Sequence, residues 1–189
     1  RNLSPDEIFD QVLTIDQQSR LYYGRPLRNI VFMGMGEPMM NYKNVVDSIR
    51  KITSPDGLGM SPKRITVSTS GIPKMIKMLA DEDLKVKLAL SLHTAIEHKR
   101  NMVMPFSKKF PLSEVMESLQ YWYQKTKSII TFEYCVWGGI NDTDEDIKAL
   151  IKFCRQVPSK VNLIQYNPIG EGKYDHRNTL AEERYIQEL

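Results

Sequence analysis

Five apolar segments of the chain each end in glycine or in polar side chains that could bind a ligand. The endings are Gly34-Met35-Gly36-Glu37-Pro38, Ser68-Thr69-Ser70-Gly71, Ser91-Leu92-His93, Gly138-Gly139-Ile140-Asn141-Asp142 and Gln165-Tyr166-Asn167-Pro168. A glycine turn beside a carboxylate suits a ligand with an ammonium group, and serine hydroxyls suit a carboxylate or a ribose. An amino acid that carries a sugar meets all of these demands.

The first ending is poorly suited to phosphate. It lacks the Lys-Ser/Thr pair of a P-loop, and Met39 stands where the third glycine of a dinucleotide-binding GxGxxG motif would be. The Glu37 carboxylate would also repel a phosphate group. Two simpler interpretations stay open: Gly34–Pro38 as a tight turn between strand and helix, and His93 as a hydrogen-bonded histidine without a ligand.

Cysteine and histidine spacing argues against a metal site built within this chain. Cys135 and Cys154 form no CxxC pair, and His93 and His98 are five residues apart, which places them on different sides of any helix. Both cysteines fall at apolar positions and are expected in the core. Glu133 alternates with Cys135 in the same strand, so we expect it to point into a barrel. A buried carboxylate needs a partner, which leaves a structural ion pair, the interpretation we favour, or a catalytic role.

The elements that would position these residues alternate between helix and strand. Strands are expected over residues 29–33, 64–68, 87–92, 129–136 and 161–164. Ser4 and Thr143 have the form of helix caps, and the first helix should run to about Gln18. Each expected strand is apolar on both faces, which predicts a parallel sheet covered on both sides, either open or a complete or partial barrel. The active site of such a fold lies at the carboxyl ends of the strands.

Composition is that of a globular protein with a mildly basic charge. The chain has 189 residues, 41% hydrophobic and 26% charged, with a net charge of +3. It has no apolar run near the roughly 20 residues of a membrane helix, and its polar start does not resemble a signal peptide. We expect a soluble, cytoplasmic protein. Since the chain starts at Arg1 rather than Met, we interpret it as one domain, residues 1–189, of a longer protein.

The basic pairs Lys63-Arg64, Lys99-Arg100 and Lys108-Lys109 are expected to be solvated surface charge. An RNA-binding footprint would require such residues to cluster in space.

Taken together, the endings closely resemble those of the radical S-adenosylmethionine (SAM) RNA methyltransferases. The resemblance rests on Met33-Gly34-Met35-Gly36-Glu37-Pro38, Ser68-Thr69-Ser70-Gly71, Ser91-Leu92-His93 and Tyr166-Asn167-Pro168, in this order and at similar spacings. It extends from Arg1 to about Pro168 and is greatest with the dual-specificity enzymes that methylate C2 of adenine in 23S rRNA and tRNA.

This resemblance implies a partial (β/α)₆ barrel, of which the chain would supply five strands. It implies SAM binding by Gly36, Glu37, Ser68, Asn167 and the segment Ser91-Leu92-His93. It also implies a [4Fe–4S] cluster, whose CxxxCxxC ligands would precede Arg1, and a methyl-carrying cysteine that neither Cys135 nor Cys154 matches. The implied partners are 23S rRNA, tRNA and an electron donor such as flavodoxin or ferredoxin, with no membrane.

We expect this chain alone to hold no cluster, no catalytic residue and no activity. Three alternatives are a C8-specific adenine methyltransferase of the same class, a non-catalytic RNA-binding relative, and an ordinary barrel enzyme. The last would need an active Lys87 or Lys160, and both fall at strand starts, the wrong end of a barrel.

Overall fold

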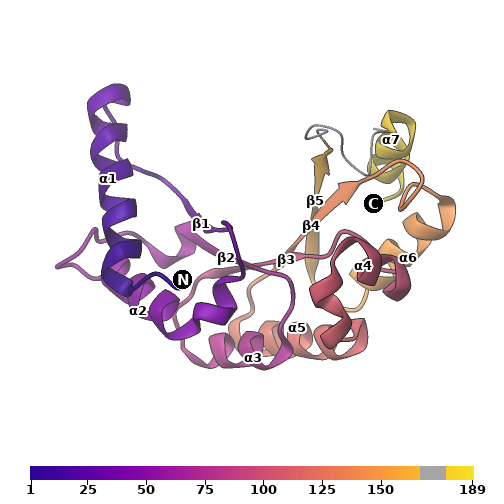
Figure 1. Cartoon of the computed structure of the whole chain (residues 1–189), viewed down its shortest axis with the longest axis horizontal. Coiled ribbons are helices and arrows are strands. Elements are labelled where there is room, and N and C mark those ends of the chain that lie inside the picture. Colours follow the sequence, from indigo (N-terminus) through magenta and orange to yellow (C-terminus); the bar gives the residue numbers. More distant parts are fainter. Residues whose placement is uncertain (167–177) are drawn as a thin grey trace.

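The computed structural model describes residues 1–166 and 178–189, and its central feature is a curved sheet of five parallel strands (Figure 1). The strands are β1 (Ile30–Phe32), β2 (Ile65–Thr69), β3 (Lys87–Ser91), β4 (Ile130–Val136) and β5 (Ser159–Gln165), and they neighbour one another in sequence order. Parallel pairing brings all five carboxyl ends to the same edge. The partial barrel expected from the sequence is confirmed.

Helices connect the strands and cover the convex side of the sheet (Figure 1). The α-helices are α1 (Pro5–Tyr23), α2 (Tyr42–Thr53), α3 (Pro73–Asp81), α4 (Glu97–Val103), α5 (Leu112–Thr126), α6 (Asp144–Cys154) and α7 (Thr179–Glu188). Three short 3₁₀ helices are η1 (Pro38–Asn41), η2 (Pro62–Arg64) and η3 (Pro105–Lys109). No helix in the described ranges is long and apolar enough to cross a membrane.

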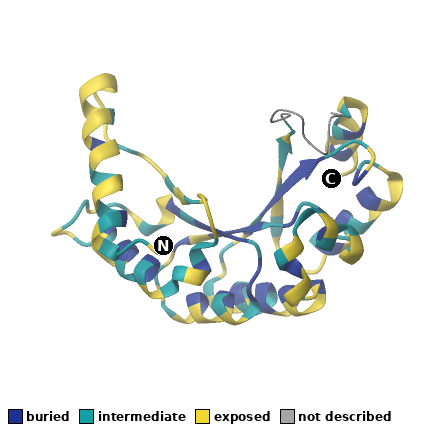
Figure 2. Ribbon diagram, viewed as in Figure 1, coloured by how far each residue is buried: buried dark blue, intermediate teal, exposed yellow. Residues whose placement is uncertain are grey.

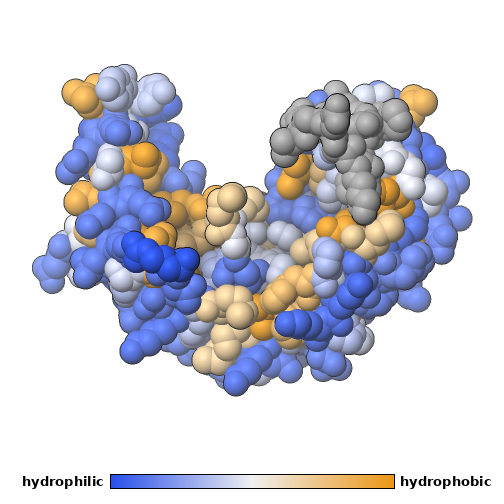
Figure 3. All heavy atoms as spheres, viewed as in Figure 1, coloured by the Kyte–Doolittle hydropathy of each residue, from blue (hydrophilic) through white to orange (hydrophobic). Residues whose placement is uncertain are grey.

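The two faces of the sheet differ in character, which corrects the expectation of strands that are apolar on both faces. Val67 and Leu90, on the convex face, are fully buried beneath the helices. The opposite face carries small or polar side chains. The register places Ser68 beside Ala89 and Ser91 beside Glu133 on this face. This concave face borders the hollow seen in Figure 3. The middle strands form the buried centre of the molecule in Figure 2. A polar inner face suits a ligand-binding barrel rather than a sheet covered by helices on both sides.

Both predicted helix caps are present. The Ser4 hydroxyl accepts from the Glu7 N–H at 3.2 Å, and the Glu7 carboxylate accepts from the Ser4 N–H at 2.8 Å. Thr143 and Asp146 form the same reciprocal pair at α6. These bonds satisfy N–H groups that a helix start otherwise leaves without partners.

Helix α1 continues five residues beyond its predicted end and stops at Tyr23. The Asp16 carboxylate explains the extension, since it accepts from Arg20 Nε and from the Leu27 N–H, both at 2.7 Å. Gly24, at φ +65°, then ends the helix. Helix α4 is not among the predicted elements, because its buried side chain is Arg100 rather than an apolar residue.

Gly71 is required where β2 leaves the sheet. Its φ is +96°, and an added Cβ would lie 3.0 Å from Leu90 Cδ1 and 3.3 Å from Val115 Cγ1. Gly24 also has a positive φ, but no atom lies within 4 Å of its added Cβ. A comparison of the two positions therefore distinguishes the cost of backbone strain, which both share, from the cost of a steric clash, which applies to Gly71 alone.

We predict that Gly71→Ala destabilises the protein by at least about 1 kcal/mol more than Gly24→Ala. Gly24→Ala should lower the free energy of unfolding only by the roughly 1–2 kcal/mol that a side chain costs at positive φ. Gly71→Ala should add to this the cost of a clash with Leu90 and Val115. Urea unfolding of both variants measures the difference. Equal losses of unfolding free energy would contradict the packing argument.

Candidate cofactor site at the carboxyl ends of the strands

A cavity of about 190 Å³ lies at the carboxyl ends of β1, β2 and β3. Residues predicted from the strand endings line it: Gly36, Glu37, Ser68, Ser91 and His93. The lining is completed by Met33, Gly34, Pro38, Thr69, Ser70 and Met104. Three strand ends, together with Met104 at the end of α4, thus meet where the sequence places a binding site.

Glu37 connects the first two strand ends. One carboxylate oxygen, Oε2, accepts from both the N–H and the hydroxyl of Ser70, each at 2.7 Å. The other, Oε1, accepts from the Met39 N–H at 3.0 Å, at the start of η1. A carboxylate offers about four acceptor positions, so one remains for a ligand donor. Glu37 therefore both fixes the edge of the cavity and presents negative charge to it.

Gly36 allows the chain to turn from β1 toward Glu37. Its φ is +111°, a conformation that side-chain-bearing residues rarely adopt. An added Cβ would meet no atom within 4 Å. The glycine therefore serves the backbone turn and leaves open space beside the Glu37 backbone, into which a ligand can approach closely.

Ser68 and Ser91 lie on the same, concave face of the sheet. Ser68 is paired in register with Ala89, two residues before Ser91, and alternate residues of a strand share a face. Ser68 is buried and Ser91 is partly buried at the end of β3. Their hydroxyls can donate to and accept from a carboxylate or a sugar hydroxyl.

His93 is held in a defined orientation by backbone groups of β4. Its Nδ1 accepts from the Cys135 N–H at 3.2 Å, so the proton of the neutral ring must reside on Nε2. The Trp137 ring packs against it edge-on, with ring centroids 5.4 Å apart. Burial, and secondly the positive charge of Arg100, lower the pKa of His93 to about 4. His93 is therefore a neutral hydrogen-bond donor at the cavity wall.

Asn141 fixes the end of β4 and is a functional position that the choice of site residues missed. Its fully buried amide donates to the carbonyls of His93 at 2.6 Å and Cys135 at 2.8 Å, and accepts from the Trp137 N–H at 2.7 Å. One side chain thus satisfies three backbone groups and holds His93 at its φ of +59°. The sequence did contain a signal for it, because Asn141 belongs to the polar ending of the fourth expected strand.

Arg100 corrects the expectation that the Lys99-Arg100 pair is solvated. Arg100 is fully buried, and its Nη2 donates to the Ser70 carbonyl at 2.5 Å and more weakly to that of Ser91 at 3.4 Å. Its Nε and Nη1 have no hydrogen-bond partner among the described residues. Desolvation lowers the pKa of Arg100 to about 10. A positive charge therefore lies behind the strand ends that form the cavity.

Lys99 is largely buried as well, and it pairs with the buried Asp146 carboxylate at 2.8 Å. The bond ties α4 to the start of α6. Burial of both residues depends on partners that are distant in the sequence, so local pattern alone could not reveal it.

Two predicted site residues do not contribute side chains to the described cavity. Leu92 is fully buried in the apolar core, and its N–H donates to the Glu133 carbonyl at 3.0 Å. Only its backbone lies near the rim. Asn167 falls outside the described residues.

Neither cysteine is placed for metal binding. Cys135 is buried, and Cys154 packs against the core. Burial raises the pKa of Cys135 to about 11, which keeps the thiol protonated. Within residues 1–166 and 178–189, no three His, Cys, Asp or Glu side chains are grouped to hold a metal ion. Glu133 faces the concave side as expected, but its partner among the described residues is the neutral Asn162 amide, which donates to it at 2.6 Å, rather than the cation of the favoured ion pair.

The donor set fits an aminoacyl nucleoside such as SAM. A carboxylate with a free acceptor position can take an ammonium group, while serine hydroxyls and the His93 Nε2–H can bind carboxylate or ribose oxygens. The volume is below the roughly 300–1,000 Å³ of most ligand pockets. The cavity therefore accommodates part of such a molecule.

We predict that His93 stays neutral down to about pH 4. Nitrogen NMR of the ring should show Nε2 protonated and Nδ1 bare at neutral pH. Because the pKa is lowered from 6.5 to about 4, the unfolded chain binds more protons in that window, so stability falls as pH decreases from about 6.5 to 4.

The loss should be roughly 3 kcal/mol across the window, at about 1.4 kcal/mol per unit of pKa shift, and His93→Asn should remove most of it. His98→Asn, at an exposed position of α4, is the matched control for the loss of a histidine side chain as such. A His93 titration midpoint near 6.5 would contradict the Cys135 hydrogen bond.

Comparison with known proteins places the chain in one family. It is 62% identical over its whole length to the "Probable dual-specificity RNA methyltransferase RlmN" of Flavobacterium psychrophilum, covering 54% of that protein. The protein of the same name from Flavobacterium johnsoniae is 59% identical, again over the whole chain and 54% of the relative. The chain thus spans about half the length of these curated relatives. No family model matches it.

A solved structure agrees with these relatives. The crystal structure of a radical SAM methyltransferase from Sphaerobacter thermophilus superposes with a TM-score of 0.95 at 35% identity, and the match covers all of this chain and 55% of that one. The sequence resemblance, the parallel sheet and the residues gathered at its carboxyl edge lead to the same conclusion: the chain belongs to the RlmN family of radical SAM RNA methyltransferases.

Proposed function

We propose that the protein containing this chain methylates C2 of adenine in 23S rRNA and tRNA, and that residues 1–189 form a single radical SAM core domain within it. The observation that carries the proposal is the meeting of Glu37, Ser68, Ser91 and His93 in one cavity. The family of the chain supports RNA as the substrate.

The residues of this segment would bind and orient SAM. Glu37 would accept from its ammonium group, while Ser91 and the His93 Nε2–H would donate to its carboxylate or ribose oxygens. Ser68 and the backbone of Leu92 would complete the wall, with Gly36 giving the ligand close access to the chain. By family resemblance, Asn167 would join them. Bound SAM supplies the methyl group and, beside a reduced iron–sulfur cluster, the radical that activates it.

The [4Fe–4S] cluster would be held by cysteines outside this segment, upstream of Arg1, because Cys135 and Cys154 form no CxxxCxxC motif and Cys135 is buried. An electron donor such as flavodoxin or ferredoxin would reduce the cluster, and the protein would act in the cytoplasm.

The direct test is methylation by the full-length protein. After anaerobic reconstitution with iron and sulfide, the enzyme should convert adenosine in 23S rRNA and tRNA to 2-methyladenosine, detected by mass spectrometry of digested RNA. Formation of 8-methyladenosine instead would transfer the proposal to the C8-specific class. Unmodified RNA with a fully assembled cluster would refute both.

Glu37 is predicted to contribute directly to SAM affinity. Glu37→Gln in the full-length protein should weaken SAM binding about 10- to 100-fold by calorimetry, because an amide loses the charge that attracts an ammonium group. Ser70→Ala, which removes one of the two Ser70 bonds to the carboxylate, should weaken binding less.

Glu114→Gln provides the control, since Glu114 is exposed on α5. If Ser70→Ala weakened SAM binding as much as Glu37→Gln, then Glu37 would act only by fixing the loop. If neither substitution changed affinity, the site assignment would be wrong.

A further inference from the structure

The amino ends of β1, β2 and β3 carry a dense group of exposed basic side chains. We call Arg25, Arg28, Lys63, Arg64, Lys85 and Lys87 the basic stripe. Arg25 and Arg28 precede β1, Lys63 and Arg64 belong to η2 before β2, and Lys85 and Lys87 stand at the start of β3. Register pairs Ile30 with Ile65 and Thr66 with Lys87, so the three groups are neighbours along one edge.

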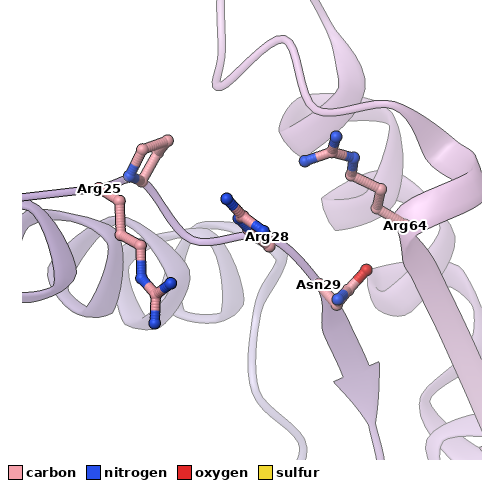
Figure 4. A pocket seen from close by; sticks show the side chains of 5 residues that line it. Arg25, Arg28, Asn29 and Arg64 are labelled. Carbon is pink, nitrogen blue, oxygen red and sulfur yellow. The ribbon is translucent and has the colours of Figure 1, made fainter. Parts of the chain in front are cut away.

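Little negative charge balances the stripe. The hollow beside β1 is lined by Arg25, Pro26, Arg28, Asn29 and Arg64, without a carboxylate (Figure 4). In this view the guanidinium of Arg64 extends toward Arg28, whereas that of Arg25 turns to the other side of the loop. Among the described residues, none forms an ion pair or side-chain hydrogen bond with these three guanidinium groups.

A second hollow, of about 570 Å³, extends the stripe toward β3. Its charged lining consists of one acidic residue, Asp83, and five lysines: Lys63, Lys85, Lys87, Lys125 and Lys127. Lys125 is paired with Asp81 and lies over the Tyr121 ring, and Lys127 lies over the Tyr123 ring. The chain has a net charge of only +3. Concentrating so many cations along one edge opposes folding through mutual repulsion, so the edge is suited to an anionic partner.

We propose that the basic stripe is a docking site for the phosphate backbone of RNA, separate from the cofactor cavity. The inference rests on the proposed function, which makes RNA the substrate. Exposed Tyr22 and Tyr23, at the end of α1 next to Arg25, offer faces on which unpaired bases can stack. Arginine favours phosphate because its planar group makes paired hydrogen bonds.

Position favours RNA over an acidic protein as the partner. The stripe lies at the amino ends of the strands and the cofactor cavity at the carboxyl ends. The five residues of β2 separate them by about 16 Å at roughly 3.3 Å per residue. A folded RNA can contact both edges at once, whereas an electron-donor protein must approach the cofactor end.

The test measures RNA affinity of the full-length reconstituted enzyme against salt. The variant Arg25→Gln/Arg28→Gln/Arg64→Gln removes three stripe charges. The matched control, Lys74→Gln/Lys77→Gln/Lys148→Gln, removes three exposed charges from α3 and α6. All six positions are exposed, and thermal unfolding will verify that both variants fold.

The stripe variant should bind tRNA at least about tenfold more weakly than the wild type, while the control stays within about twofold. The slope of log affinity against log salt should become shallower by about 2, because each of the three lost phosphate contacts contributes about 0.7 on a single strand. SAM affinity should not change in either variant.

Equal affinities and slopes for the stripe and control variants would overturn the inference, even if the wild type methylates RNA normally. Unchanged RNA affinity with slower reduction by an acidic electron-donor protein would assign the stripe to that donor and also overturn it. A wild type that binds no RNA at any salt concentration would refute the proposed function itself.

Discussion

The carboxylate of Glu37 joins the ends of two neighbouring strands, β1 and β2. Its bonds to the N–H and hydroxyl of Ser70 tie the loop after β1 to the end of β2. Arg100 holds the carbonyl of the same Ser70 from behind, and reaches toward that of Ser91. Buried hydrogen bonds of charged groups are strong and directional. The shape of the cavity therefore depends on this chain of contacts from β1 through β3.

The far wall follows the same principle. Asn141 binds three backbone groups around the end of β4, and the Cys135 N–H fixes the ring of His93. Tyr185 of α7 donates to the Asn141 carbonyl at 2.6 Å, which anchors the last helix to this wall. Residues from distant parts of the chain thus hold the rim before a ligand arrives, and preorganisation of this kind lowers the cost of binding.

Much of this arrangement could be predicted from the sequence, because apolar runs and caps are local signals. The five strands, the caps at Ser4 and Thr143, and the polar strand ends were predicted, and parallel pairing then brought Glu37, Ser68, Ser91 and His93 together. The polar inner face, the burial of Arg100 and the bonds of Asn141 were not. Each depends on which side chains and backbone groups from distant parts of the chain, in strands, in α4 and in the loop after β4, come together, and composition does not reveal that.

The two edges of the sheet have opposite character. A carboxylate and neutral donors line the cavity at the carboxyl ends, while uncompensated cations gather at the amino ends. A ligand with an ammonium group fits the first edge and a polyanion fits the second. The fold separates these environments by the length of the strands, so one domain can offer both without mutual interference.

The most direct measurement of the central claim is a crystal structure of the full-length protein with bound SAM. The aminoacyl end should lie at the strand ends, with its ammonium group within hydrogen-bond distance of Glu37 and an oxygen within reach of the His93 Nε2. SAM bound elsewhere, with Glu37 still engaged only by Ser70 and Met39, would contradict the account.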